Sequence, residues 1–239
     1  LVGSEMCIRD RSTLFHVSTC QKMVKKAIVD NLKDAYKVTW LDETEEDYPI
    51  QVSILKDMAT ITMDTSGIGL HKRGYRIKTV EAPMKETLAA SLVLLSYWNK
   101  DRVLYDVFCG SGTIPIEAAM IGRNIAPGLA RDFASKHWKW ISKDIWKEET
   151  RAAYQAMDND VELKIFASDI SARDIEAAKE NAEEAGVEDC IEFRQADFKE
   201  IKYENNYGIV ISNPPYGERL DTEHTVRAMV LSLIHISEP

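Results

Sequence analysis

Three apolar runs of the sequence each end in residues that could bind a ligand. The first leads into Asp106 and the turn Gly110-Ser111-Gly112, the second ends at Asp169 and the third at Asp197. Glycines let the backbone turn sharply and approach a ligand, and carboxylates accept hydrogen bonds from ribose hydroxyls or from an exocyclic amine. This order of residues indicates a binding site for a nucleoside-containing ligand.

A fourth apolar run ends in the sequence ISNPPYG at residues 211–217. Two consecutive prolines remove backbone donors and stiffen the turn. The Asn213 side-chain oxygen and the Pro214 carbonyl are then acceptors suited to the two hydrogens of an exocyclic NH₂ group. Tyr216 offers an aromatic face on which a planar base can stack. The run therefore predicts a site for an amine-bearing base.

The glycine turn alone does not identify the ligand, because nicotinamide dehydrogenases also contain one. Their GxGxxG fingerprint needs a third glycine, and Pro115 stands in that place here. Cys109 lies inside the turn, where we expect its backbone to act and not a nucleophilic thiol. The four cysteines form no CxxC pair, and no histidine lies at zinc-ligand spacing from them, so the sequence predicts no metal site.

Alternating apolar patterns predict the elements that must position these residues. The predicted strands are 102–108, 163–168, 190–194 and 207–212, and the predicted helices are 85–98, 113–122 and 172–185, with an insertion at 123–160. Strands that alternate with helices favour an α/β fold with a doubly wound parallel sheet. Before it, a helix at 13–32 and strands at 37–41, 50–55 and 58–64 predict a small α+β unit.

A basic run, HKRGYRIK at residues 71–78, lies between these two units and contains no acidic residue. Its cations are Lys72, Arg73, Arg76 and Lys78. Such a run is either a solvated linker or a contact for nucleic acid, and the sequence leaves both interpretations open.

Composition excludes several classes of protein. The 239 residues are 45% hydrophobic and 29% charged, as in an ordinary globular protein. The net charge of −9 excludes a surface that binds nucleic acid everywhere, although a local basic patch remains compatible with it. No apolar stretch approaches the ~18 residues of a membrane span. The cysteine pattern favours a reducing, cytoplasmic location.

The motif order DVFCGSGT, SDI, ADF and NPPYG resembles the class I S-adenosylmethionine-dependent methyltransferases that methylate amines. The longer strings SGIGLHKRGYR, EAPMKETLAASL, IEAAMIGRNIAPG and NPPYGERL resemble the THUMP-domain RNA guanine-N2 methyltransferases, and most of all the bacterial enzymes of large-subunit ribosomal RNA. The similarity covers about residues 13–230. It implies a Rossmann-like class I methyltransferase domain preceded by a partial THUMP domain, with S-adenosylmethionine as cofactor.

The resemblance also assigns roles to motif residues. The implied cofactor-binding residues are Asp106, Phe108, Cys109, Gly110, Gly112, Thr113, Asp169, Ile170, Asp197, Phe198 and Asn213. Of these, residues 106–112 would surround the methionine part, Asp169 the ribose and Asp197 the adenine. The implied catalytic residues are Asn213, Pro214, Pro215 and Tyr216.

Domain boundaries follow from the same resemblance. We expect a partial THUMP domain at 13–70, a basic linker at 71–82 and an incomplete methyltransferase domain at 83–230. Residues 1–12 and 231–239 carry no pattern that continues into the neighbouring chain, which predicts a non-native leader and tail. Sheets of the family have seven strands, and four are predicted here, so we expect the last three to be missing.

The predicted function is methyl transfer to an exocyclic amine of an RNA base, guanine N2 of ribosomal RNA above all, with transfer RNA as another substrate. A DNA adenine-N6 or protein glutamine-N5 methyltransferase can use the same NPPY turn, but the preceding α+β unit disfavours both. A non-catalytic RNA-binding relic is disfavoured by the intact Asp169, Asp197 and Asn213. The sequence gives no indication of the oligomeric state.

Overall fold

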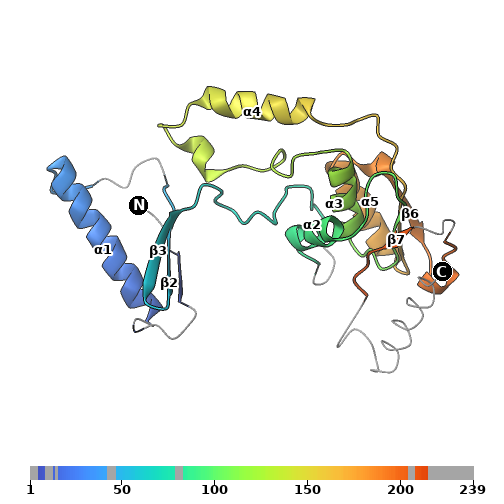
Figure 1. Cartoon of the computed structure of the whole chain (residues 1–239), viewed down its shortest axis with the longest axis horizontal. Helices are drawn as coiled ribbons and strands as arrows, with labels where there is room; N and C mark the ends of the chain where they lie inside the picture. The colour runs from blue at the N-terminus through green and yellow to red at the C-terminus, as the bar shows by residue number, and fades with distance from the viewer. Residues whose placement is uncertain are drawn as a thin grey trace. The chain divides into compact units, whose positions relative to one another are not determined.

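The computed structural model describes residues 5–8, 13, 16–41, 47–78, 83–203 and 208–214 (Figure 1). The chain forms two compact units. The first consists of residues 1–69 and 132–147, and the second of residues 70–131 and 148–239. Part of the predicted insertion therefore belongs to the N-terminal unit.

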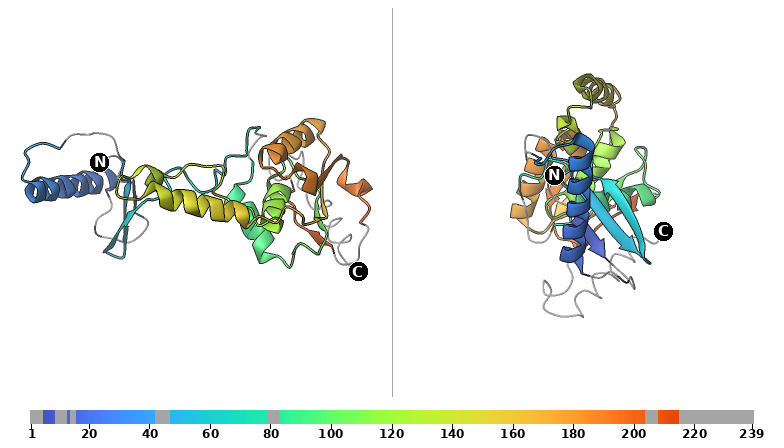
Figure 2. Two further views of the ribbon diagram at one scale, coloured as in Figure 1. Left: turned by 90° about the horizontal axis from the view of Figure 1, so that it is seen from above. Right: turned by 90° about the vertical axis from the view of Figure 1, so that its left-hand side faces the viewer.

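The first unit contains a three-stranded sheet and one long helix. Its elements are β1 (Glu5–Ile8), α1 (Val17–Tyr36), β2 (Ile50–Leu55) and β3 (Met58–Met63), with a short 3₁₀ helix η1 (Ala134–His137). β2 pairs in parallel with β1 and antiparallel with β3. Cys20 of α1 packs on Val52 and Ile54 of β2, which places the small core between the helix and the sheet (Figure 2).

The prediction of a strand at 37–41 is wrong. Lys37 ends α1 in the left-handed conformation, with φ 54°, and residues 38–41 form no strand. Both edges of β2 are occupied, one by β3 and the other by β1, so no edge of β2 is available to residues 38–41. β1 lies within residues 1–12, for which the sequence predicts a non-native leader. The predicted leader and the other domain boundaries stay predictions.

The second unit has the predicted α/β architecture. Its elements are α2 (Glu86–Leu95), β4 (Leu104–Asp106), α3 (Thr113–Gly122), β5 (Ile165–Asp169), α5 (Ala172–Glu184), η2 (Glu188–Cys190), β6 (Ile191–Gln195), η3 (Phe198–Glu200) and β7 (Ile209–Val210). Helix α4 (Lys143–Gln155) begins in the first unit and continues into the second. The strands are parallel in the order β6-β5-β4-β7, so the chain reverses direction across the sheet between β4 and β7. Ligands of open α/β sheets bind at the carboxyl ends of the strands at such a reversal.

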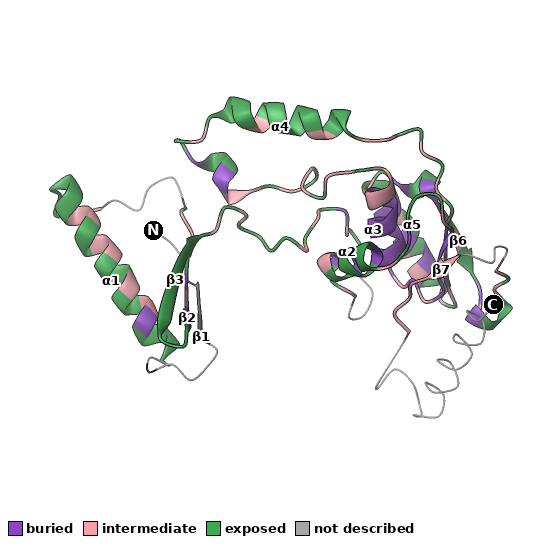
Figure 3. Cartoon of the chain, viewed as in Figure 1, coloured by how far each residue is buried: buried purple, intermediate pink, exposed green. Residues whose placement is uncertain are grey.

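Two helices of the second unit support this edge. α3 is mostly apolar and its residues 113–120 are buried, as in a helix inside a domain (Figure 3). α5 begins at Ser171, whose side chain caps the helix by accepting a hydrogen bond from the Asp174 N–H. Ile175 and Ala178 of α5 are buried. The start of each helix is therefore fixed next to the end of a strand.

Some classes of feature do not occur in the part of the chain that the structure describes. None of its helices is both long and apolar enough to cross a membrane. No three His, Cys, Asp or Glu side chains among the described residues are placed to bind a metal ion. Cys20, Cys109 and Cys190 are free thiols.

Candidate cofactor-binding and catalytic site

The loop after β4 contacts the ends of both neighbouring strands. The Cys109 N–H donates to the Ser168 carbonyl of β5 at 3.0 Å. The Gly110 N–H donates to a carboxylate oxygen of Asp169 at 3.0 Å, and the Phe108 N–H donates to the Ser212 hydroxyl oxygen, also at 3.0 Å. Residues from three of the four predicted motifs therefore meet at one edge of the sheet.

Two positions of this loop require glycine. Gly110 and Gly112 have φ values of 51° and 81°, a region that other residues rarely adopt. A Cβ at Gly112 would also lie 3.0 Å from the Cβ of Ala178 on α5. The turn leads into α3 at Thr113, where the first backbone N–H groups of a helix have no partner within the helix and favour an anionic group.

Asp106 is the buried carboxylate of the site. One of its oxygens accepts a hydrogen bond from the Ser212 hydroxyl at 2.5 Å and another from the Phe108 N–H at 3.3 Å. The pKa of Asp106 is raised to about 7, chiefly by burial and to a lesser extent by the charge of Asp169, while these two hydrogen bonds lower it. Near neutral pH, a cation next to Asp106 would favour its ionised form.

Asp169 and Asp197 are held by local hydrogen bonds at the ends of β5 and β6. Asp169 accepts from the Ser171 N–H as well as from Gly110, both at 3.0 Å. Asp197 accepts from the Lys199 N–H at 3.0 Å and caps η3. A carboxylate has about four lone-pair positions, so these bonds leave each group able to accept from a ligand.

An aromatic pair lies beside these carboxylates. The rings of Phe108 and Phe198 are 5.1 Å apart between centroids, and Phe198 is buried. Ile170 follows Asp169 and is 70% exposed. Phe108 is only partly buried, so its ring could pack against a flat heterocycle.

Cys109 is not poised as a nucleophile. Its thiol is buried, and burial raises its pKa well above the usual value, with a further rise from the charges of Asp106 and Asp169. A thiol in such surroundings stays protonated near neutral pH and is unreactive.

Asn213 and Pro214 follow β7 and are partly buried. The Ile211 N–H, just before them, donates to the Tyr105 carbonyl at 3.0 Å, which extends the pairing of β7 with β4. Ser212, next to Asn213, is fixed by its two bonds to the β4 loop. Sequence reasoning overlooked Ser212, although a hydroxyl at the end of an apolar strand and next to Asn213 could have indicated it. Pro215 and Tyr216 lie outside the described residues.

The four cations of the basic run differ in their surroundings. Arg73 lies 3.5 Å from the buried Glu117, and Arg76 lies 2.8 Å from the buried Glu86. Both arginine side chains are therefore largely taken up by contacts inside the second unit. Lys72 and Lys78 are exposed and are therefore the most accessible of the four, and the RNA-binding role of all four stays a prediction.

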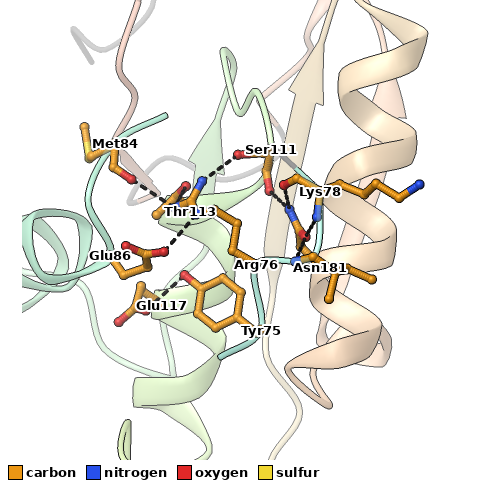
Figure 4. A network of polar contacts seen from close by, with 10 residues as sticks. Tyr75, Arg76, Lys78, Met84, Glu86, Ser111, Thr113, Glu117 and Asn181 are labelled. Carbon is orange, nitrogen blue, oxygen red and sulfur yellow. Dashed lines mark hydrogen bonds and ion pairs between the residues drawn. The ribbon is translucent and has the colours of Figure 1, made fainter. Parts of the chain in front are cut away.

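Three further residues make polar contacts with segment 70–78 that the sequence did not reveal (Figure 4). They are Glu86 on α2, Glu117 on α3 and Asn181 on α5, and all three are buried. Their partners lie ten or more residues away along the chain, so no local pattern predicts the contacts.

Family models match most of the chain. A model described as "RMKL-like, methyltransferase domain" matches residues 73–236, and a THUMP domain model matches residues 6–64. The chain is 50% identical over 231 residues to "Putative RNA methyltransferase YpsC" of Bacillus subtilis, and 43% identical over 203 residues to "Ribosomal RNA large subunit methyltransferase K/L" of Shewanella pealeana. The matches cover 96% and 82% of this chain, but only 60% and 29% of those proteins.

Solved structures agree with the fold. A predicted N6-adenine-specific DNA methylase from Listeria monocytogenes matches 95% of this chain with a TM-score of 0.87 at 50% identity. A putative methyltransferase complexed with SAH matches 96% with a TM-score of 0.85 at 39% identity. The chain spans 60% and 62% of those two structures, respectively.

Proposed function

The chain belongs to the RMKL-like methyltransferase family and has a THUMP domain, and we propose that it transfers a methyl group from S-adenosylmethionine to guanine N2 of ribosomal RNA. The observation that carries this proposal is the hydrogen bond from Ser212 to Asp106. This bond links the Asn213-Pro214 turn to the loop after β4 that contains Gly110-Ser111-Gly112, called the glycine loop below. The oxygens of Asn213 and Pro214 would then lie next to the proposed cofactor site.

The residues at the strand ends fit S-adenosylmethionine. The glycine turn and the start of α3 would hold its carboxylate, Asp169 its ribose hydroxyls and Asp197 its adenine amine. The buried carboxylate of Asp106 would favour the positive charge of the methionine part. When bound, this cofactor supplies a methyl group that is already activated. The structure with SAH supports the proposal because it shares 39% identity with this chain.

Orientation of the target amine would fall to Asn213 and Pro214. Their oxygens can accept the two amine hydrogens, which holds the nitrogen lone pair out of conjugation with the ring as the nitrogen becomes tetrahedral. These hydrogen bonds strengthen toward the transition state, so they raise the rate and not only the affinity. Pro215 and Tyr216, from the same motif, would stiffen the turn and stack on the base.

RNA is the proposed macromolecular substrate. The THUMP match and the names of the relatives support it, as does the pair of exposed lysines, Lys72 and Lys78. Ribosomal RNA comes before transfer RNA because of the large-subunit methyltransferase relatives. We place the activity in the cytoplasm, in keeping with the free thiols of Cys20, Cys109 and Cys190.

The decisive experiment offers the whole protein and S-adenosylmethionine to ribosomal RNA, transfer RNA, DNA and protein in parallel. Mass spectrometry of the digested products then identifies the methylated unit. We expect N2-methylguanine from ribosomal RNA, and Asn213→Ala should lower kcat ~100-fold or more while the affinity for S-adenosylhomocysteine stays near wild type. Methylation elsewhere, or normal turnover of this variant, would contradict the proposal.

A second candidate is methylation of adenine N6 in DNA. The Listeria protein favours it, because that protein is described as a predicted N6-adenine-specific DNA methylase and is 50% identical to this chain. The same turn can accept the hydrogens of either amine, so geometry does not separate the two substrates. N6-methyladenine in the DNA sample, with unmodified RNA, would establish this alternative.

A further inference from the structure

Arg76 joins the segment 70–78 to the glycine loop (Figure 4). Its side chain is only 14% exposed, and its Nε donates to Glu86 at 2.8 Å. One terminal nitrogen donates to the Ser111 hydroxyl at 3.0 Å; the other donates to the Thr113 hydroxyl at 3.0 Å and to the Met84 carbonyl at 2.9 Å. Because Ser111 and Thr113 flank Gly112, one guanidinium holds both sides of the turn.

Asn181 of α5 completes the attachment. Its amide nitrogen donates to the carbonyls of Ser111 at 3.1 Å and Lys78 at 3.0 Å. Its oxygen accepts from the N–H groups of Ile77 at 3.0 Å and Lys78 at 2.9 Å. A side-chain amide has two donors and two lone pairs, so this fully buried residue is saturated. Segment 70–78, the glycine loop and helix α5 are therefore fixed to one another.

The contacts with Arg76 also determine what the loop hydroxyls can do. Ser111 and Thr113 accept from the guanidinium through oxygen lone pairs, so each keeps its own hydrogen as a donor. The buried Glu86 balances the charge of Arg76. Two hydroxyl donors therefore remain at the start of α3, where an anionic group is favoured.

We propose that Arg76 and Asn181 are positioning residues, which hold the glycine loop in its ligand-binding conformation through the segment 70–78. A loop that is already ordered does not lose conformational entropy when the ligand binds, so affinity depends on these contacts. The inference rests on the proposed use of S-adenosylmethionine, and its ligand group is the carboxylate of that cofactor or of S-adenosylhomocysteine.

The test measures binding of S-adenosylhomocysteine to the chain by calorimetry and hydrogen exchange of residues 109–113 without ligand. Arg76→Lys keeps a cation for Glu86 but has no planar fork to bond to Ser111, Thr113 and Met84 together. We expect about tenfold weaker binding, the effect of losing roughly one hydrogen bond, and faster exchange in the loop. Wild-type affinity and wild-type exchange would overturn the proposal.

Arg73→Lys is the matched control. Arg73 lies on the same segment, is 12% exposed, pairs with the buried Glu117 and donates to the Leu70 carbonyl, neither of which belongs to the loop. It should leave both binding and loop exchange unchanged. An equal loss of S-adenosylhomocysteine affinity in Arg73→Lys would mean that segment 70–78 affects binding only through the overall stability of the fold.

The double variant Arg76→Gln/Glu86→Gln separates positioning from folding. It removes the buried ion pair without leaving one charge unpaired, so thermal stability should recover relative to Arg76→Gln alone. Weak binding in the recovered protein supports positioning, and restored binding overturns it. If wild-type chain binds no S-adenosylhomocysteine, the proposed function fails, whereas loop exchange in Arg76→Lys still decides this inference.

Discussion

The Ser212 hydroxyl donates to the Asp106 carboxylate across 2.5 Å, and this contact joins the last residue of β4 to the residue just before Asn213. The same hydroxyl oxygen accepts from the Phe108 N–H at 3.0 Å. One side chain thus fixes the distance between the proposed cofactor loop and the proposed catalytic turn. Its removal should affect stability and turnover together.

Ser212→Ala should lower the free energy of unfolding by ~1–3 kcal/mol, because a buried carboxylate and a backbone donor each lose a partner. It should also lower kcat more than it raises the KM for S-adenosylmethionine, since Ser212 holds the proposed catalytic turn Asn213-Pro214 and is not proposed to bind the cofactor. Chemical denaturation and steady-state kinetics measure the two effects. Ser212→Thr keeps the hydroxyl and serves as control. An alanine variant as stable as wild type would refute the anchoring role.

Asp106 should make stability depend on pH. Its pKa is raised from 3.8 to about 7 in the folded chain, so the folded state retains a proton that the unfolded state loses above pH 4. The stabilising contribution is full below about pH 4 and is lost as the pH rises through 7. The free energy of unfolding of Asp106→Asn minus that of wild type should therefore increase from pH 5 to pH 8, by ~2–3 kcal/mol at most.

Urea unfolding of both proteins at pH 5 and pH 8 measures this difference. Asp144→Asn changes an exposed carboxylate and serves as the control at both pH values. A difference between Asp106→Asn and wild type that is the same at both pH values would show that the buried carboxyl titrates normally.

Gly112→Ala should destabilise the chain more than Gly186→Ala. Both glycines have positive φ, 81° and 69°, and an alanine costs roughly 1–2 kcal/mol in that region. Only at Gly112 would the new Cβ also meet a neighbour, Ala178 at 3.0 Å, whereas a Cβ at Gly186 meets nothing within 4 Å. The difference in unfolding free energy therefore isolates the contact with α5. Ala178→Gly should restore part of the loss, and equal costs at the two glycines would contradict the close approach.

Local sequence predicted the elements that carry the site more accurately than it predicted their contacts. Helix 113–122 has the predicted bounds, because Gly112 supplies a left-handed start and Pro115 is tolerated within the first turn. The strand at 37–41 failed for a nonlocal reason, since β1 and β3 occupy both edges of β2.

The basic run at residues 71–78 also shows that local sequence does not predict contacts with distant residues. Arg76 and Lys72 look alike in the sequence, yet Arg76 is buried against Glu86 while Lys72 is exposed. Trp138 is buried in the first unit, where its indole N–H donates to the Asp47 carbonyl at 2.9 Å. Which cation or aromatic side chain faces water is decided by partners that lie far away along the chain.

Lys72 and Lys78 provide the last prediction, because they are the exposed cations of the basic run. Lys78 lies 3.3 Å from Glu180 in an exposed ion pair, which costs little to exchange for a phosphate. Each phosphate contact with single-stranded RNA contributes ~0.7 to the slope of log affinity against log salt. Lys72→Ala/Lys78→Ala should therefore reduce that slope by about 1.4 if both lysines contact phosphates. Titrations of labelled ribosomal RNA at several salt concentrations measure it.

The control for this pair must remove the same charge from the same unit. Lys100→Ala/Lys179→Ala does so, and Lys100 resembles Lys78 because it too has an exposed ion pair, with Asp158 at 3.6 Å. If only net charge matters, both double variants lose affinity equally and the slopes fall together. If the segment 70–78 contacts RNA, only Lys72→Ala/Lys78→Ala has a smaller slope. An unchanged slope in that variant would leave residues 71–78 as a linker, in which Arg76 contacts the glycine loop and the lysines serve solvation alone.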